Sequence, residues 1–393
     1  MSKQRMIDRI EALRPLLTGL ADRIHGYAEL KFEEHRSAAD LAEALAAEGF
    51  AVETGVAGLE TAFIARYGEG RPRIAYLAEY DALPGIGHGC GHNLIGPASV
   101  GAAIALKDEI ARGTVSGSVW VIGTPAEEGG GGKVTMVERG VFDDVDVVMM
   151  VHPFNRSVLD YGTIAVASVT VEYFGRESHA SVEPHLGRNA LDAAILLFNA
   201  VNAMRQQVTP DVRMHGIIAE GGQAPNVIPA YTRCEWLLRA ETSEGLADLE
   251  RRFQACAEAA GQAAGCTTKV QVKMRYKPRV PNPVLLELYR ANFEALGATL
   301  DEPPEVGGRG SSDMGDVSQV VPTIQCYIRI APDDVAWHTP RVAELAASPA
   351  GHAMVLLGAK VLAMTGFDVL SDPDVQQRIR AAFERTLGAR AAS

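Results

Sequence analysis

The sequence is poor in cysteine, and its cysteines show no regular spacing. Of its 393 residues only five are cysteines, namely Cys90, Cys234, Cys256, Cys266 and Cys326. An odd and scattered set does not build a disulfide framework of the kind found in small secreted proteins. We therefore expect a reducing compartment, the cytoplasm.

Basic tracts and long apolar runs are also missing. The 37 basic residues are outnumbered by 49 acidic ones, which gives a formal charge of −12, whereas proteins that bind nucleic acids concentrate positive charge. The segment Met1–Arg9 is charged and lacks the apolar core of a signal peptide. No uninterrupted apolar stretch approaches the length that spans a bilayer. We therefore expect neither a nucleic-acid partner nor a membrane partner.

Strands that alternate with helices predict a layered α/β protein. We expect strands at Ala51–Thr54, Thr61–Tyr67, Arg73–Ala78, Val119–Gly123, Val147–Val151 and Thr323–Ile328. We also expect two N-terminal helices, the second from an N-cap at Ser37 to Gly49, and two helices at the C-terminus. This alternation favours a mostly parallel sheet covered by helices, which we assign to residues 1–162 and 278–393.

The pattern changes after Gly162. Strand and helix signals follow in the order β-α-β-β-α-β over residues 163–277, which is the ferredoxin-like arrangement, so we expect an inserted domain there. Its first segment, Thr163–Phe174, is long and rich in β-branched residues. We expect this segment to form an exposed sheet edge, and such an edge invites pairing with a second chain.

Polar side chains follow three of the predicted strands at their carboxyl ends. Cys90 and His92 follow the third strand, Glu127 and Glu128 follow the fourth, and His152 follows the fifth. Open α/β sheets keep their functional sites at this edge, and thiolate, imidazole and carboxylate are the ligands of catalytic zinc. The sequence therefore predicts a metal site at the carboxyl edge of the sheet.

A more distant histidine, His338, adds a fifth donor to Cys90, His92, Glu128 and His152. Five donors are too many for one tetrahedral ion with an open position. They suit two divalent ions about 3.5–4 Å apart that share a bridging ligand, and a thiolate can bridge. Zinc is the first expectation, and manganese, cobalt and nickel also suit these donors.

The paired acids Glu127 and Glu128 predict two different roles. Neighbouring side chains on an extended segment point in opposite directions, so Glu127 cannot easily bind the same ion as Glu128. On a tight glycine loop, Glu127 could instead face the attacking water. There it would take the water's proton and pass it to the leaving nitrogen.

With these residues in place, the chain resembles the dinuclear metallo-amidohydrolases and metallopeptidases that include aminoacylases, indole-acetyl-amino-acid hydrolases and aminobenzoyl-glutamate hydrolases. The resemblance covers almost the whole length and rests on an ordered set of motifs. The motifs are Asp81-Ala82-Leu83-Pro84-Gly85, Cys90-Gly91-His92, Pro125-Ala126-Glu127-Glu128-Gly129-Gly130, Ser178-His179-Ala180, Gly221-Gly222, Asn226-Val227-Ile228-Pro229, Ser311-Ser312-Asp313-Met314 and His338.

This resemblance implies roles for the residues that match the motifs. It implies that Cys90 is the bridging ligand and that the remaining ligands are His92, Glu128, His152 and His338. Glu127 would be the general base and acid. The inserted domain would be a dimerisation or lid domain, whose His179 polarises the scissile carbonyl in the partner's site.

Further polar residues are candidates for a role in the site. Asp81 is expected to hold a ligand histidine in place, although a loop-capping aspartate would look the same. Asn226, His215 and Arg309 lie near the expected binding loops and are candidates for substrate binding, with a local structural role as the alternative for each. His88 could orient a ligand or serve as a turn histidine.

One departure from the family pattern concerns Asn93 and Ile95, where the acyl-amino-acid branch usually has aspartate and histidine. The form found here is closer to the aminobenzoyl-glutamate and dipeptide-cleaving branch. We therefore expect a hydrolase that cleaves the amide bond of an N-acyl amino acid or related small amide with a metal-activated water. A dipeptidase for β-alanyl or basic dipeptides is the alternative enzyme. A regulatory dimer that binds metal without turnover is a further alternative, but the retained Glu127 argues against it.

Overall fold

The structure is a computed structural model that describes residues 1–303 and 309–391. It divides into two compact units. The first contains Met1–Gly162 and most of the chain after Pro278, and the second contains Thr163–Pro278 with a short segment that ends at Ser312. This segment is tied to the second unit because Arg239 donates a hydrogen bond of 2.7 Å to the Ser311 hydroxyl.

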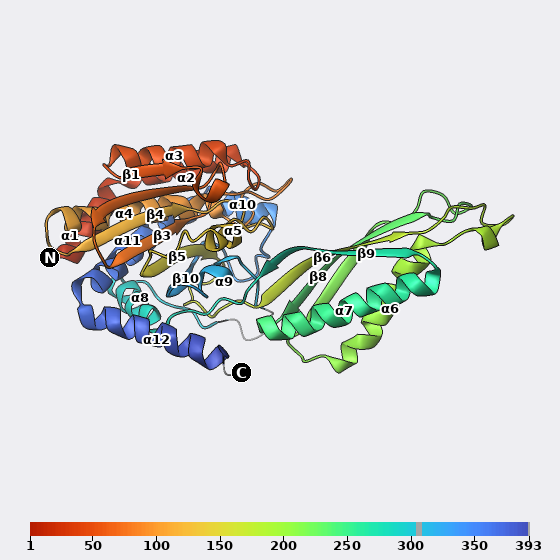
Figure 1. The fold of residues 1–393 in the computed structure, drawn as a ribbon. Coiled ribbons are helices and arrows are strands. Elements are labelled where there is room, and N and C mark those ends of the chain that lie inside the picture. The colour runs from red at the N-terminus through yellow and green to blue at the C-terminus, as the bar shows by residue number, and fades with distance from the viewer. Residues whose placement is uncertain (304–308, 392–393) are drawn as a thin grey trace. The chain divides into compact units, whose positions relative to one another are not determined.

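The first unit is built around a six-stranded sheet (Figure 1). The strands are β1 (Ala51–Thr54), β2 (Phe63–Glu69), β3 (Arg73–Ala78), β4 (Gly117–Gly123), β5 (Val147–Phe154) and β10 (Thr323–Arg329). Their order is β1-β2-β4-β3-β5-β10. The pairs β4–β3, β3–β5 and β5–β10 are parallel, and β1 and β2 add an antiparallel edge. The prediction of a mixed α/β fold with a mostly parallel sheet is confirmed.

Ten α-helices are described in the first unit. They are α1 (Ser2–Ala12), α2 (Arg14–Tyr27), α3 (His35–Ala47), α4 (Ile95–Ala111), α5 (Gly132–Glu138), α8 (Pro283–Ala295), α9 (Met314–Val317), α10 (Pro340–Ala346), α11 (Pro349–Ser371) and α12 (Pro373–Ala391). The expectation of two helices at each end was wrong, because three cover the N-terminal region and three the C-terminal region. Ser37 is not an N-cap either. It lies inside α3, where its hydroxyl donates to the Glu29 carboxylate at 2.8 Å.

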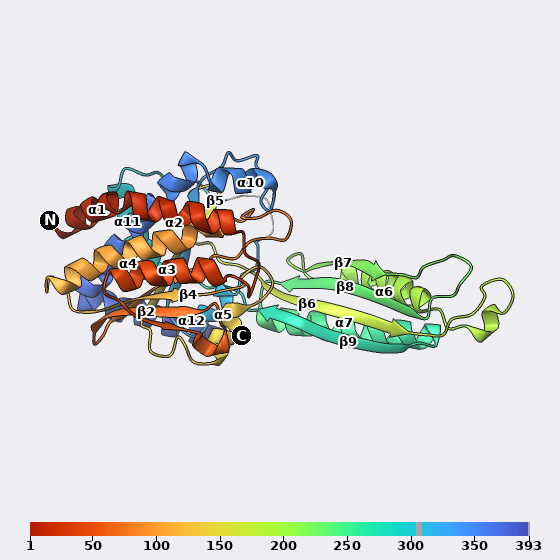
Figure 2. The ribbon, with the colours of Figure 1, turned by 90° about the horizontal axis from the view of Figure 1, so that it is seen from above.

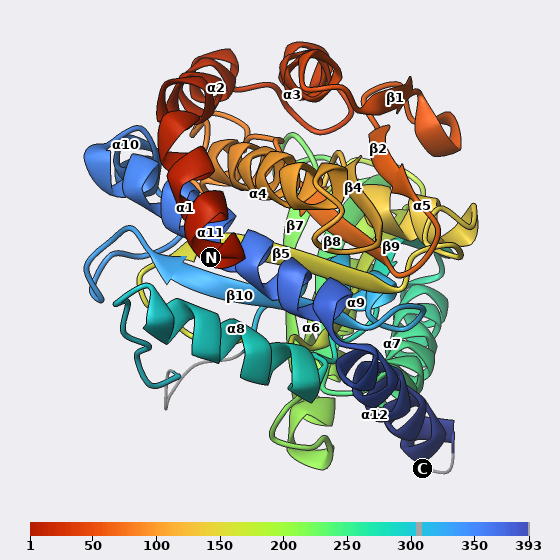
Figure 3. The same ribbon diagram turned by 90° about the vertical axis from the view of Figure 1, so that its left-hand side faces the viewer.

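The central strands β3, β4 and β5 are buried on both faces, which explains why their sequences are largely apolar, whereas the edge strand β1 is mostly exposed. Along β3, the side chains of Ile74 and Tyr76 join one core, whereas Ala75 and Leu77 join a second core that includes Met314 and Val317 of α9. Helices α4 and α11, which contribute to the first core, pack against each other (Figure 3). α11 is long and apolar enough to cross a membrane by length and composition, yet 72% of its most apolar window is buried inside the protein. Such burial is typical of a core helix.

The second unit has the element order β-α-β-β-α-β (Figure 2). Its elements are β6 (Ala165–Phe174), α6 (Ala190–Met204), β7 (Arg213–Glu220), β8 (Tyr231–Ala240), α7 (Ser243–Ala264) and β9 (Thr267–Tyr276). The antiparallel sheet has the order β7-β8-β6-β9, and α6 and α7 share its apolar core. The expectation that β6 forms an edge was wrong, because β9 pairs with its second side. The edges are β7 and β9.

Candidate metal centre

The predicted ligands of the first unit converge at the carboxyl ends of the parallel strands. The segment from Glu79 to Asn93 follows β3, the Glu127–Glu128 pair follows β4, and His152 lies near the end of β5. His338 comes from the stretch between β10 and α10, where its backbone N–H donates to the Gly89 carbonyl at 3.1 Å. Tertiary folding therefore brings the distant histidine to the loop that carries the cysteine.

The donor atoms form three overlapping groups, each within 4.8 Å. The groups are Cys90–His92–His152, Cys90–Glu128–His338 and His92–Glu127–Glu128. Cys90 belongs to two of them, so its sulfur lies between two sets of donors. This is the arrangement that a bridging thiolate would need.

A buried aspartate holds two of these donors in position. Asp81 Oδ1 lies 2.9 Å from His92 Nδ1, and Asp81 Oδ2 accepts the backbone N–H of Glu128 at 2.8 Å. Because Nδ1 is engaged, Nε2 of His92 is the nitrogen left for a ligand, as in other sites where a carboxylate orients a metal-binding histidine. Nε2 is buried and makes no hydrogen bond among the described residues. An orphaned nitrogen of this kind fits a metal ion.

The electrostatics of the site favour charged donors. Burial would raise the pKa of Cys90, but the neighbouring His92 and His152 outweigh it and lower that pKa to about 6. His152 Nε2 lies 3.7 Å from the sulfur. Contacts with Cys90 and Glu128 raise the pKa of His338 to about 10, and its Nε2 lies 3.4 Å from Glu128 Oε1. A thiolate and carboxylates held among imidazoles are the donors that divalent ions such as zinc bind.

The loop after β4 turns tightly and presents both acids to the same place. Ala126 has a positive φ of 61°, and its carbonyl accepts the N–H groups of Gly130 and Gly131 at 3.1 and 2.9 Å. The segment is therefore not extended, and both Glu127 and Glu128 approach His92. Burial and the charges of Glu128 and Glu79 raise the pKa of Glu127 well above its ordinary value.

The loop has no room for larger side chains. A Cβ added at Gly132 would lie 1.9 Å from the Pro125 carbonyl oxygen, and one at Gly130 would lie 2.5 Å from the Ala126 Cβ. Both distances are below any normal contact, so glycine is required there. The crowding fixes the backbone on which Glu127 and Glu128 are mounted.

The candidates of the second unit fall at two ends of its sheet. His179 pairs with Val227 through an isolated bridge, and the Asn226 carbonyl accepts the Ala180 N–H at 3.0 Å, so the His179 and Asn226 loops are joined. A cavity of about 370 Å³ lies beside them, lined by residues such as Gly221, Gly222 and Pro229.

His215 lies on β7 opposite Leu237, and Arg309 pairs with Glu241 at 2.7 Å. Both partners lie near the end of β8 at Ala240, whereas the Asn226 loop precedes its start at Tyr231. The structure therefore does not gather the three expected substrate-binding residues into one cluster.

His88, which could have oriented a ligand or served as a turn histidine, places its Nε2 3.0 Å from the Ile24 carbonyl oxygen. Other residues beside the metal donors were not predicted. Sequence reasoning missed Lys133, which is fully buried between Glu79 and Asp313, and Glu34, which accepts the Ala126 N–H at 2.8 Å. A lysine directly after four glycines was the only available signal for the first, and no signal pointed to the second.

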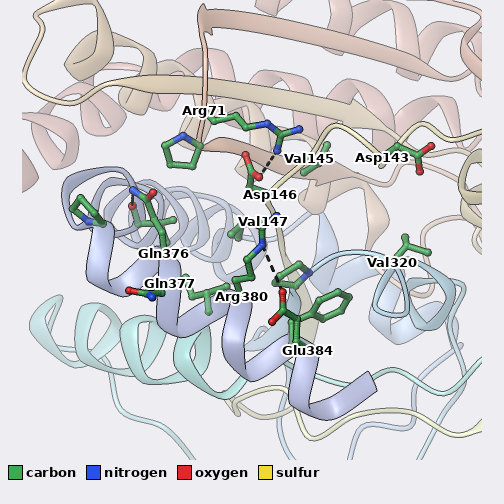
Figure 4. A pocket seen from close by; sticks show the side chains of 16 residues that line it. Arg71, Asp143, Val145, Asp146, Val147, Val320, Gln376, Gln377, Arg380 and Glu384 are labelled. Carbon is green, nitrogen blue, oxygen red and sulfur yellow. Dashed lines mark hydrogen bonds and ion pairs between the residues drawn. The ribbon is translucent and has the colours of Figure 1, made fainter. Parts of the chain in front are cut away.

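A larger cavity of about 700 Å³ lies at the other edge of the sheet, near the amino ends of β3 and β5 and against α12 (Figure 4). Two arginines line it, and each pairs with a neighbouring acid, Arg71 with Asp146 and Arg380 with Glu384. Its two arginines therefore pair with acids of the lining, and the lining contains none of the donor groups described above.

Comparisons with known proteins identify the family. The model of peptidase family M20/M25/M40 matches residues 75–357. The chain is 38% identical to a mouse (Mus musculus) Xaa-Arg dipeptidase over 97% of this chain and 92% of the relative. It is 31% identical to one of the subunits of the p-aminobenzoyl-glutamate hydrolase of Escherichia coli, over 94% of this chain and 92% of the relative.

Solved structures show the same fold. A putative aminohydrolase from methicillin-resistant Staphylococcus aureus aligns with a TM-score of 0.74 at 22% identity, covering 94% of this chain and all of that one. A Bacillus subtilis dinuclear metal-binding peptidase from the M20 family aligns with a TM-score of 0.63 at 19% identity, covering 90% and 99%. The family match spans most of the sequence, and its donors lie together in the structure. The chain therefore belongs to peptidase family M20/M25/M40 and is a hydrolase of C–N bonds in linear amides.

Proposed function

We propose that this protein hydrolyses the amide bond that joins an acyl or aminoacyl group to an amino acid, in a cytoplasmic setting and with two divalent metal ions. One observation carries this proposal: the Cys90 sulfur belongs to two of the three donor groups, one with His92 and His152 and the other with Glu128 and His338. A single sulfur shared in this way suits a pair of ions rather than one. Cys90 would bridge, with the remaining ligands being His92, Glu128, His152 and His338.

Zinc is the first choice for both ions, with manganese, cobalt and nickel as alternatives. Bound there, the ions would supply Lewis acidity for the substrate carbonyl and for the attacking water. Asp81 would hold His92 and the Glu128 backbone in place through its two carboxylate oxygens. Such outer contacts fix the orientation of ligands.

Glu127 would move the proton. It lies on the same turn as Glu128, so the carboxylate proposed as a base and the carboxylate proposed as a ligand both lie close to His92. The base would take a proton from the attacking water and return it to the leaving nitrogen, a role typically worth about 10²–10⁴-fold in rate. The C–N bond then breaks, and the products are a carboxylate and an amine.

The second unit would be a ferredoxin-like domain that forms a homodimer. Its edge strand β7 carries the exposed apolar side chains of Ile217 and Ile218, which are 63% and 39% exposed. An apolar, unpaired strand edge favours pairing with a second copy. In such a dimer, His179 would polarise the scissile carbonyl in the partner's site, with Asn226 beside it and with His215 and Arg309 as further substrate contacts.

Two substrate classes have specific support. The 38% identity to Xaa-Arg dipeptidases of mouse and human favours dipeptides that end in a basic residue. The 31% identity to a subunit of a p-aminobenzoyl-glutamate hydrolase favours N-acyl amino acids. Dipeptides with a C-terminal arginine or lysine are therefore the first class to assay, and N-acyl amino acids and aminobenzoyl-glutamate are the second.

The deciding experiment measures amine release by protein reconstituted with zinc, manganese or cobalt. We expect close to two metals per chain by elemental analysis and turnover of at least one of the two classes, with Glu127→Gln as the inactive control. Full activity with one metal per chain would contradict the two-ion arrangement. Failure to release amine from either class would contradict the proposed substrates.

The role of His179 has its own test. His179→Ala and Glu127→Gln chains are mixed, and subunit exchange is allowed. If His179 acts across the dimer, each mixed dimer has one intact site and activity returns. If it acts within its own chain, every site stays damaged.

Placing a charged side chain on the edge strand β7 tests the proposed dimer. Ile217→Asp on β7 should yield monomers in sedimentation velocity, and Gln271→Asp on the opposite edge strand β9 is the matched control. A monomeric parent protein, or a dimer that resists Ile217→Asp, would exclude pairing through β7.

A further inference from the structure

Three charged side chains beside the metal donors are completely buried and have no role in the mechanism above. The Lys133 ammonium lies 2.7 Å from Asp313 Oδ1 and 2.6 Å from Glu79 Oε1. The exposed fraction of each of these three side chains is 1% or less. The backbone N–H of Lys133 also donates to Asp313 Oδ2 at 3.0 Å.

Stability alone does not account for this cluster. Removing charges from water is costly, and buried ion pairs are often no more stabilising than apolar residues of the same volume. Here one ammonium faces two carboxylates, so the cluster keeps an excess negative charge inside the protein. A buried cluster of this kind is better explained by what it holds in place.

Each member of the cluster is attached to part of the metal centre. Lys133 is the second residue of α5 and comes directly after the glycine loop that carries Glu127 and Glu128. Glu79 is the first residue after β3, and its second oxygen lies 3.6 Å from His92 Nε2, the nitrogen that is left for a ligand. Asp313 precedes the short helix α9. One ammonium therefore ties the loop of the acids to the strand end beside the ligand histidine.

Without its contact to Lys133, the Glu79 carboxylate could reach the metal ligands. Its Oε2 makes no hydrogen bond among the described residues and faces the ligand nitrogen of His92. A carboxylate in that position can itself bind a divalent ion. With Lys133 present, the other oxygen of Glu79 is held by the ammonium, which restricts the rotation that would bring the carboxylate onto a metal.

We propose that Lys133 is a positioning residue for the hydrolysis proposed above, because it anchors the Glu127–Glu128 loop and keeps the Glu79 carboxylate from becoming an extra ligand. The inference rests on the proposed function for its catalytic readout, but its effect on the metal centre does not require turnover. Lys133 itself touches neither substrate nor ion in this proposal.

The test compares Lys133→Met with Lys107→Met. Lys107 is a matched control because its ammonium also lies between two carboxylates, 3.3 Å from Glu48 and 3.2 Å from Asp108, on helix α4 away from the donors. We expect Lys133→Met to lower kcat by about 10²-fold, the scale of a misplacement of catalytic groups by about 1 Å, with KM changed by less than about twofold. Lys107→Met should leave both parameters unchanged. A Lys133→Met enzyme with unchanged kcat would overturn the proposal.

A triple variant separates positioning from folding. Glu79→Gln, Lys133→Met and Asp313→Asn together remove every charge of the cluster while keeping its shape. Because this variant also removes the Glu79 carboxylate, it tests the loop-anchoring role of Lys133 alone, and recovery of stability and kcat together would overturn that role. If Lys133 positions the loop, stability recovers but kcat stays low.

The visible absorption spectrum of cobalt-loaded protein gives a readout without substrate. We expect Lys133→Met to change the spectrum, because an added carboxylate ligand alters the geometry around cobalt, and we expect Lys133→Met with Glu79→Gln to restore it. An unchanged spectrum in Lys133→Met would overturn the ligand-exclusion part of the proposal. Absence of turnover in the parent enzyme would count against the proposed function and would leave this spectroscopic test valid.

Discussion

A buried carboxylate next to the loop that carries Glu127 and Glu128 makes the stability of the first unit depend on pH. Glu34 precedes helix α3 and is fully buried. One oxygen accepts the Ala126 N–H at 2.8 Å and the other accepts the Thr61 hydroxyl at 2.8 Å. Burial, reinforced by the charge of Asp81, raises the pKa of Glu34 from 4.5 to about 7.

The sign of the effect follows from which form the folded protein prefers. Because the folded pKa is above the unfolded one, the stabilising contribution of Glu34 is complete below about pH 4.5 and is lost as the pH rises through about 7. The interval from 4.5 to 7 corresponds to roughly 3 kcal/mol at about 1.4 kcal/mol for each pKa unit. The folded protein therefore loses up to this amount between acidic and mildly alkaline pH.

Glu34→Gln removes the titration and keeps the contacts. The amide oxygen can accept the Ala126 N–H, and the amide nitrogen can donate to the Thr61 hydroxyl oxygen. Relative to the parent, the variant should therefore gain up to about 3 kcal/mol of unfolding free energy between about pH 5 and about pH 8. All other titrating groups are common to both proteins, so their contributions cancel in the difference.

The assay is urea unfolding of the metal-free protein at several pH values, followed by tryptophan fluorescence. Glu33→Gln, which replaces the exposed neighbouring carboxylate, is the control for the loss of one glutamate at this place in the chain. A flat difference for Glu34→Gln over the same range would refute the reasoning, because it would mean that Glu34 ionises in the folded protein as easily as in the unfolded chain.

Three further outcomes are expected. Glu127→Gln should lower kcat by at least about 10²-fold with metal content nearly unchanged, whereas Glu128→Gln should lower the metal content. If kinetics and elemental analysis gave the opposite pair of results, the roles of base and ligand would have to be exchanged. Cys90→Ser should reduce the number of bound ions per chain, and two tightly held ions in this variant would show that the thiolate is dispensable. Arg279→Met should lower the unfolding free energy by about 3–5 kcal/mol in denaturant titrations. In the parent protein the Arg279 guanidinium lies 2.9 Å from the buried Asp160 carboxylate, which the variant leaves without its charge partner. A loss below about 1 kcal/mol would contradict this.

The strands of the central sheet were the most predictable part of the fold. β1 and β3 have the predicted bounds. For β3 the reason is that a strand buried on both faces is a short apolar run between turn residues. The N-terminal helices were less predictable. Ser37 looks like an N-cap in the sequence, but its hydroxyl is bound by Glu29, and the helix begins two residues earlier at His35.

The site was predictable where its residues stand in compact motifs. Cys90, Glu128 and their neighbours follow strand ends, so the sheet topology alone predicts that they meet. Lys133 and Glu34 were not predictable, because their partners Asp313 and Ala126 lie 180 and 92 residues away in the sequence. Only tertiary packing shows that a lysine after a glycine run is buried among acids.

The crowding of the glycine loop also bears on how relatives of this protein can diverge. A Cβ added at Gly130 or Gly132 would lie closer to neighbouring atoms than a normal contact allows. Any substitution at either position would therefore disturb the fold of the loop, whatever its effect on activity. New substrate preferences must therefore arise from substitutions elsewhere in the chain. The loop that carries Glu127 and Glu128 would therefore stay nearly constant among relatives while the surfaces around it change. Relatives would keep the same type of reaction and differ in the substrates that they accept.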